Sequence, residues 1–148
     1  MSALGAIPRQ AAVAIDDLLD NCGQIQAGQH VLIVAALDGL HGGGNIVDEQ
    51  TVAWIQAAVQ LRGAHASVLW LDLPIRPARL WSDGSGKPEA WRVPPVLKGA
   101  LSHADVFINH CVDLSFEEEL KEVRDILAEH DVAMVRNMAT TAPLLASA

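Results

Sequence analysis

The sequence predicts a three-layer α/β domain, in which a mostly parallel sheet of about four strands carries helices on both faces. Two observations support this prediction. Residues 31–37 are apolar without alternation, as in a strand that is buried on both faces. Apolar runs and helical patterns then alternate along the chain, which is the order that right-handed crossovers wind into a parallel sheet.

The first half of the chain contains two helix patterns and two strand patterns. In order, these are a helix over 11–22, a strand over 31–37, a helix over about 48–62 and a strand over 66–73. Asp48 is the expected N-cap of the second helix. Three glycines are expected to end a helix or turn the chain: Gly23, Gly28 and Gly63.

The second half continues the alternation after an irregular excursion. Residues 74–95 are rich in proline and contain Trp81 and Trp91, which we expect to dock another part of the protein. The elements expected after it are a short helix over 96–104, a strand over 105–109, a helix capped by Ser115 and Glu118, and a strand over 131–135. The simplest strand order for this succession is 2-1-3-4.

This strand order predicts a ligand site where the carboxyl ends of the first and third strands meet. The expected substrate-pocket residues follow these two strands: Asp38, His41, Gly42, Gly43 and Asp113. His110 is the candidate catalytic residue, because loops at strand ends carry function disproportionately and histidine titrates near neutral pH. Four other histidines lie at element ends away from this site and are expected to be solvated: His30, His65, His103 and His130.

Two glycine motifs lie in the loop that follows the first strand. Residues 41–44 match the HGGG oxyanion loop of esterases, but the chain has no G-x-S-x-G nucleophile elbow. Residues 42–47 form a broken dinucleotide fingerprint, because Val47 replaces its third glycine. A flavodoxin-like module that binds a nucleotide or phosphate is therefore an alternative, and a purely structural or assembly domain is another.

Composition narrows the classes of partner. The net charge is −8 and no Lys/Arg stripe is present, which argues against nucleic acid or an anionic membrane as partner. No apolar run approaches the length of a membrane span, and the N-terminal residues do not resemble a signal peptide.

Cys22 and Cys111 form no disulfide framework, which fits a cytoplasmic protein. No spacing of His, Cys, Asp or Glu predicts a metal ligand in this chain.

Four segments together resemble a known family. They are residues 18–34 (LLDNCGQIQAGQHVLIV), 57–68 (AAVQLRGAHASV), 94–106 (P-x-x-L-x-x-A-L-x-x-A-D-V) and 136–141 (RNMATT). The pattern resembles the N-terminal domain of the leucyl aminopeptidases of the aminopeptidase T type. The related 2,5-dihydroxypyridine 5,6-dioxygenases, which are ring-cleaving non-haem iron enzymes, share this pattern.

The resemblance implies that residues 1–148 are one α/β domain, the N-terminal domain of a longer two-domain metalloenzyme. It further implies a divalent metal (iron, zinc or cobalt) held by a C-terminal domain that this sequence does not contain. The expected partners are a small-molecule substrate, that C-terminal domain or a partner chain, and a second copy in a homo-oligomer. The choice between an aminopeptidase-like hydrolase and a ring-cleaving oxygenase stays open.

Overall fold

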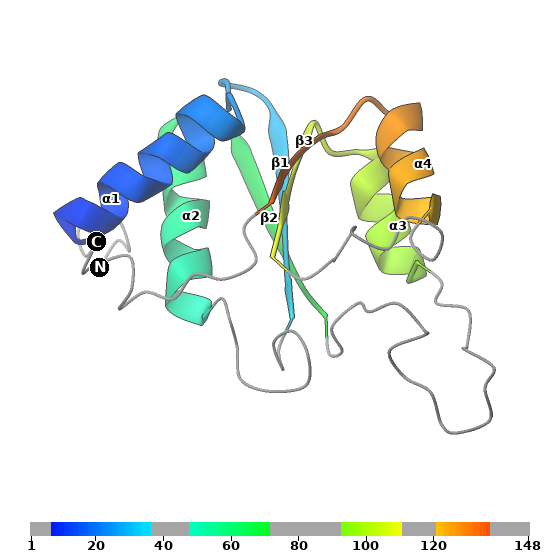
Figure 1. Ribbon diagram of the computed structural model, residues 1–148, viewed down its shortest axis with the longest axis horizontal. Coiled ribbons are helices and arrows are strands. Elements are labelled where there is room, and N and C mark those ends of the chain that lie inside the picture. The colour runs from blue at the N-terminus through cyan, green and yellow to red at the C-terminus, as the bar shows by residue number, and fades with distance from the viewer. Residues whose placement is uncertain (1–6, 37–47, 72–92, 111–120, 137–148) are drawn as a thin grey trace.

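The computed structural model describes residues 7–36, 48–71, 93–110 and 121–136, which form a layered α/β arrangement (Figure 1). Its sheet has four strands, all parallel, in the order β2-β1-β3-β4. The predicted fold class and the predicted strand order are both confirmed. The bounds of the strands are β1 His30–Ala36, β2 His65–Leu71, β3 Val106–Asn109 and β4 Ala133–Arg136.

The central strand is buried on both faces, as its uninterrupted apolar run predicts. Residues 31–35 of β1 are all buried. Ile33 lies in register with Val68 on β2 and with Ile108 on β3, so β1 is hydrogen-bonded on both sides. An apolar side chain on either face of this strand therefore leaves water completely on folding, which is the main source of stability for such a strand.

Helices cover the two faces of the sheet in pairs (Figure 1). α1 (Arg9–Asp16) runs directly into η2 (Asp17–Cys22), a π-helical segment, and this helix shares one face with α2 (Glu49–Leu61). α3 (Pro95–Ser102) and α4, described over Lys121–Glu129, share the other face. The helices that follow β1 and β3 thus lie on opposite faces of the sheet.

Each pair of helices encloses its own hydrophobic core against the sheet. The core under α1 and α2 contains, among others, Ile15, Leu19, Ile33, Ile55 and Ile108. The core under α3 and α4 contains, among others, Val34, Leu97, Leu101, Phe107 and Val123. Alternate residues of one strand feed alternate cores, because successive side chains of a strand point to opposite faces.

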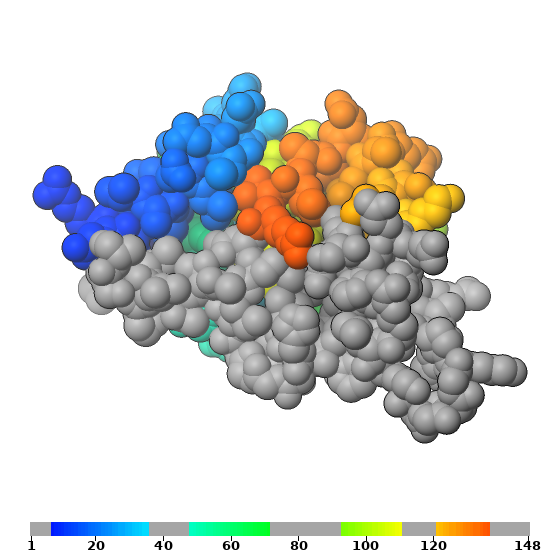
Figure 2. All heavy atoms as spheres, in the orientation of Figure 1, coloured from blue at the N-terminus to red at the C-terminus, as the bar shows by residue number. Residues whose placement is uncertain are grey.

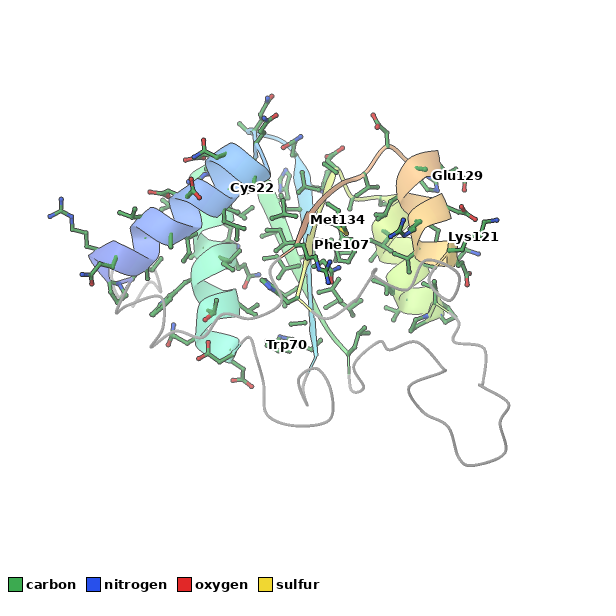
Figure 3. All side chains as sticks on the ribbon, in the orientation of Figure 1. Cys22, Trp70, Phe107, Lys121, Glu129 and Met134 are labelled. Atoms are coloured by element: carbon green, nitrogen blue, oxygen red, sulfur yellow. The ribbon has the colours of Figure 1, made fainter. Side chains whose placement is uncertain are left out.

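The strand β4 forms one edge of the described sheet. Its exposed residues lie at the surface between the α1–η2 helix and α4 (Figure 2). Val135 is buried, whereas Met134 is 37% exposed. Met134 lies in register with Phe107 of β3, and the two side chains are labelled together in Figure 3.

The predicted glycine turns are confirmed. Gly28 and Gly63 both adopt positive φ angles, +85° and +76°, which only glycine adopts without strain. The Gly28 N–H donates to the Gly63 carbonyl oxygen over 2.9 Å, so the turns that lead into β1 and β2 support each other. The α1–η2 helix ends at Gly23, as predicted.

Two apolar side chains in the predicted helices over 11–22 and 96–104, where helical spacing assigns them to the buried face, are exposed. Cys22, at the end of η2, is exposed because the wider π-helical turn shifts the phase of the buried face away from its α-helical spacing. Val96 of α3 is 60% exposed, because Leu97 and Leu101, four residues apart, define the buried face of that short helix. The capping box of Ser115 and Glu118, and most of the excursion over 74–95, lie outside the described residues.

Within the described ranges, no helix combines the length and the apolar character that crossing a membrane requires.

Candidate functional site

The carboxyl ends of β1 and β3 lie side by side, as the predicted site requires. Val34 and Asn109 are register partners near these two ends. The helix that follows β1 along the chain, α2, lies on one face of the sheet, and the helix that follows β3, α4, lies on the other face (Figure 1). In open parallel sheets, this reversal of direction is where ligands bind, because the two connections diverge and leave room between them.

His110 lies at this point, one residue beyond β3. Its backbone N–H donates to the Val34 carbonyl oxygen over 2.9 Å, so the pairing of β3 with β1 extends to this residue. The side chain is only 3% exposed, and its Nε2 atom is shielded from solvent. The candidate catalytic histidine is therefore an imidazole held in the interior at the carboxyl end of the sheet.

Asn109 is a second buried polar residue at the same end of β3. It is fully buried, and its Nδ2 group donates to Met134 Sδ over 3.7 Å. This contact crosses from β3 to the edge strand on the face that Phe107 also occupies. Burying an amide costs free energy unless the amide is hydrogen-bonded. Asn109 and the adjacent His110 thus place two buried polar side chains at the carboxyl end of β3.

The N-terminus of α2 lies at the same edge of the sheet (Figure 1). Asp48 caps this helix as predicted: its Oδ1 atom accepts hydrogen bonds from the Thr51 N–H over 2.9 Å and from Thr51 Oγ1 over 2.6 Å. Thr51 is fully buried. The cap therefore places a carboxylate at the positive end of the α2 dipole.

Trp54, in the second turn of α2, is a buried residue with a polar group that no sequence motif marks. It is 6% exposed, and its Nε1 group has no hydrogen-bond partner among the described residues. Indole N–H groups that are buried usually find an acceptor. In the sequence, Trp54 stands among the apolar residues of a helix, and periodicity alone assigns such a residue to the hydrophobic core.

The structure brings together only part of the predicted site. His110 lies at the carboxyl end of the third strand, next to the first strand, where the strand order predicts it. The other predicted pocket residues lie outside the described residues: Asp38, His41, Gly42, Gly43 and Asp113.

No group of three or more His, Cys, Asp or Glu side chains comes together as a metal site in the part of the chain that the structure describes. The remaining histidines in that part are all exposed, as predicted: His30, His65, His103 and His130. They lie toward the opposite, amino edge of the strands, the edge near Cys22 rather than near Trp70 in Figure 3. His110 is thus separated from them by the length of the sheet.

Comparisons of the chain with models of known protein families, with curated proteins and with solved structures find no match.

Proposed function

We propose that this chain is the cleft-forming α/β domain of a metal-dependent enzyme that acts on a small molecule at the carboxyl ends of β1 and β3. The observation that carries the proposal is His110, an imidazole that is 3% exposed and is held beside Val34 at the reversal point of the sheet. The resemblance to the aminopeptidase T type and its ring-cleaving relatives supplies the class of reaction, either hydrolysis or oxygenation.

In this proposal His110 acts as a proton donor or acceptor toward the substrate. Imidazole changes its protonation state near neutral pH, and positioned acid–base groups accelerate reactions by about 10²- to 10⁴-fold. The hydrogen bond from its backbone N–H to the Val34 carbonyl oxygen fixes the position of the backbone that carries the imidazole. The adjacent Asn109 amide adds a polar group at the same strand end.

The metal ligands would come from outside the described residues, since none of these residues form a three-ligand group. A second domain or a partner chain would supply them, closing the cleft over the carboxyl edge. A divalent metal there would supply Lewis acidity to the substrate. The role of this chain would be to bind and orient the substrate and to transfer a proton at His110. Association with a second copy belongs to the same proposal.

The N-terminus of α2 disfavours the alternative of a phosphate-binding module. A phosphate bound there would use the free N–H groups of the first turn and the positive end of the helix dipole. Asp48 already accepts the Thr51 N–H, and Glu49 adds a second carboxylate to the same turn. Two negative charges at this position repel a phosphate, so we rank nucleotide binding second.

The first experiment is to measure the intact mass of the protein as its source cell makes it, and to assay that protein with Fe²⁺, Zn²⁺ and Co²⁺. A mass more than twice 15.8 kDa would support a two-domain enzyme. The substrates are aminoacyl anilides for hydrolysis and dihydroxylated pyridines for ring cleavage. Absence of both activities with all three metals would contradict the proposal, and heat of binding with nucleotides or flavins would then favour the alternative.

The second experiment replaces His110. We expect His110→Ala to lower kcat by about 10²-fold or more, because the acid–base group is lost. His110→Gln keeps a polar side chain of similar size in the buried site and serves as the variant that preserves packing. His103→Gln removes an exposed histidine at the other edge and should leave kcat unchanged. Unchanged kcat in both His110 variants would remove this residue from the site.

A further inference from the structure

Histidines mark the amino edge of the sheet. His30 is the first residue of β1 and His65 is the first residue of β2, whereas His103 and His130 lie in the turns before β3 and β4. All four are exposed. Only the first two are joined by a ring contact in the described part of the chain, and their strands are direct neighbours.

The His30 and His65 rings stack on each other. The two residues are register partners on hydrogen-bonded parallel strands, so their side chains leave the sheet on the same face. The ring centroids are 4.8 Å apart and the ring planes differ by 20°. Two imidazoles thus stand next to each other at the surface, with their edges open to water.

The backbone beneath this pair is held on both sides. The His65 N–H donates to the Gln29 carbonyl oxygen over 2.8 Å. The His30 N–H donates to Asp105 Oδ2 over 2.8 Å, and the Asp105 N–H donates to the His30 carbonyl oxygen over 2.8 Å. Because the backbone at both histidines is already held by hydrogen bonds, a ligand that binds the two side chains does not also have to order the backbone, and less conformational entropy is lost on binding.

The chemistry of the pair suits a transition-metal cation. Neutral imidazole nitrogen is a preferred ligand of Zn²⁺, Ni²⁺ and Cu²⁺. Metal–nitrogen bonds of about 2.0–2.1 Å place two nitrogens on one ion about 3–3.5 Å apart. A metal ion lies in the plane of each imidazole that binds it, so the two exposed rings, whose planes now differ by 20°, would rotate about their side-chain bonds to direct one nitrogen each at the same ion. The Asp105 carboxylate beside His30 adds negative charge that favours a cation.

We propose that His30 and His65 form a two-histidine binding site for a divalent transition-metal ion of the class Zn²⁺, Ni²⁺ and Cu²⁺, with water completing its coordination. The site lies at the opposite edge of the sheet from His110 and is independent of the function proposed above.

Calorimetric titration with ZnCl₂, NiCl₂ and CuCl₂ tests the proposal on the 148-residue chain. Cys22 is an exposed thiol that would compete for the metal, so the parent protein carries Cys22→Ser and Cys111→Ser. The test variants are His30→Gln and His65→Gln. The matched controls, His103→Gln and His130→Gln, remove exposed histidines from the same edge but leave the stacked pair intact.

We expect one ion per chain in the parent, bound most tightly in the case of Cu²⁺. Each test variant should weaken binding by at least about tenfold, because the second imidazole acts at a high effective concentration. Both control variants should bind as the parent does. Equal binding in parent and test variants, loss in only one test variant, or the same loss in a control variant would each overturn the proposal.

A second measurement needs no change at the pair. In NMR spectra of the parent, substoichiometric Ni²⁺ should broaden the ring resonances of His30 and His65 before those of His103 and His130. Equal broadening of all four would show unselective binding to exposed histidines and would overturn the two-histidine site.

Discussion

Arg62 is the residue that ties the end of α2 to the α1–η2 helix. Its Nε and Nη2 atoms donate to the two carboxylate oxygens of Asp20 over 2.8 and 3.0 Å, and Nη2 also donates to Asp16 Oδ1 over 2.7 Å. Nη1 donates to the Ala58 carbonyl oxygen over 2.9 Å. The hydrogen bond from Arg62 lowers the pKa of Asp20, and the same bond raises the pKa of Arg62. A planar guanidinium is required for this arrangement.

Replacing Arg62 with Met should lower the Tm at pH 7 by about 2–4 °C, because the paired hydrogen bonds are lost while the aliphatic stem stays. Because the pKa of Asp20 is lowered in the folded state, this stabilisation is complete above the ordinary value of 3.8 and is lost as the pH falls through the folded-state pKa. The Tm difference between wild type and Arg62→Met should therefore shrink below about pH 4.

Thermal unfolding by circular dichroism from pH 2.5 to pH 7 measures this difference. Arg9→Met removes an exposed arginine from the first turn of α1 and serves as the control. A Tm difference that stays constant over this pH range would show that the carboxylate pairing does not stabilise the fold.

At the scale of single elements, α2 depends on its cap. Asp48 accepts the Thr51 backbone N–H, which the helix itself leaves without a partner, and it also accepts the buried Thr51 hydroxyl. We expect Asp48→Ala to lower the free energy of unfolding by about 1 kcal/mol, whereas Asp48→Asn should recover most of it.

Urea unfolding followed by circular dichroism checks this prediction. Glu49→Ala removes a carboxylate from the same turn without removing the cap, so it should cost less than Asp48→Ala. Equal costs for the two alanine variants would mean that charge at the helix N-terminus matters, and not the capping hydrogen bonds.

Two glycines should respond to alanine with opposite signs. Gly63 ends the α2 turn at φ +76°, and a Cβ there would lie 3.3 Å from Ala27 Cβ. Gly63→Ala should therefore destabilise the protein by about 1–2 kcal/mol. Gly99 lies inside α3, where a Cβ would meet nothing within 4 Å, so Gly99→Ala should stabilise by about 0.5–1 kcal/mol.

The same urea titrations measure both glycine variants. If both variants changed the free energy of unfolding in the same direction, one of the two assignments would be wrong: the left-handed turn at Gly63 or the helix interior at Gly99.

At the scale of the whole molecule, stability rests on two cores that share one sheet. Among the described residues, Phe107 is the largest fully buried side chain, and it lies in the core under α3 and α4. Phe107→Ala should lower the free energy of unfolding by about 3–5 kcal/mol, because it removes buried apolar surface and leaves a cavity.

Met134, the register partner of Phe107, is 37% exposed and supplies the matched control. Met134→Ala should cost far less, because water already reaches this side chain. Comparable costs for the two variants, at equal urea m-values, would show that the edge strand is as deeply packed as the centre of the sheet.

The sequence by itself determined the features that depend on neighbours along the chain. Helical and strand periodicity predicted the α/β class, the short crossovers predicted the order β2-β1-β3-β4, and the structure confirms both. The Asp48 cap and the turns at Gly28 and Gly63 were also predictable. Each involves only a few consecutive residues, whose conformations have local steric or hydrogen-bonding causes.

The tertiary structure alone decided which distant residues meet. Residue spacing could not predict that Arg62 bonds Asp16 and Asp20, or that His30 stacks on His65, because these contacts depend on helix packing and strand register. The tertiary structure also decided that two apolar side chains are exposed. Cys22 is exposed because its helix ends in a π-helical turn, and Val96 because its short helix packs through other residues. For His110, the sequence predicted the strand end, but burial against β1 came from the pairing of β3 with β1, which forms only when the sheet assembles.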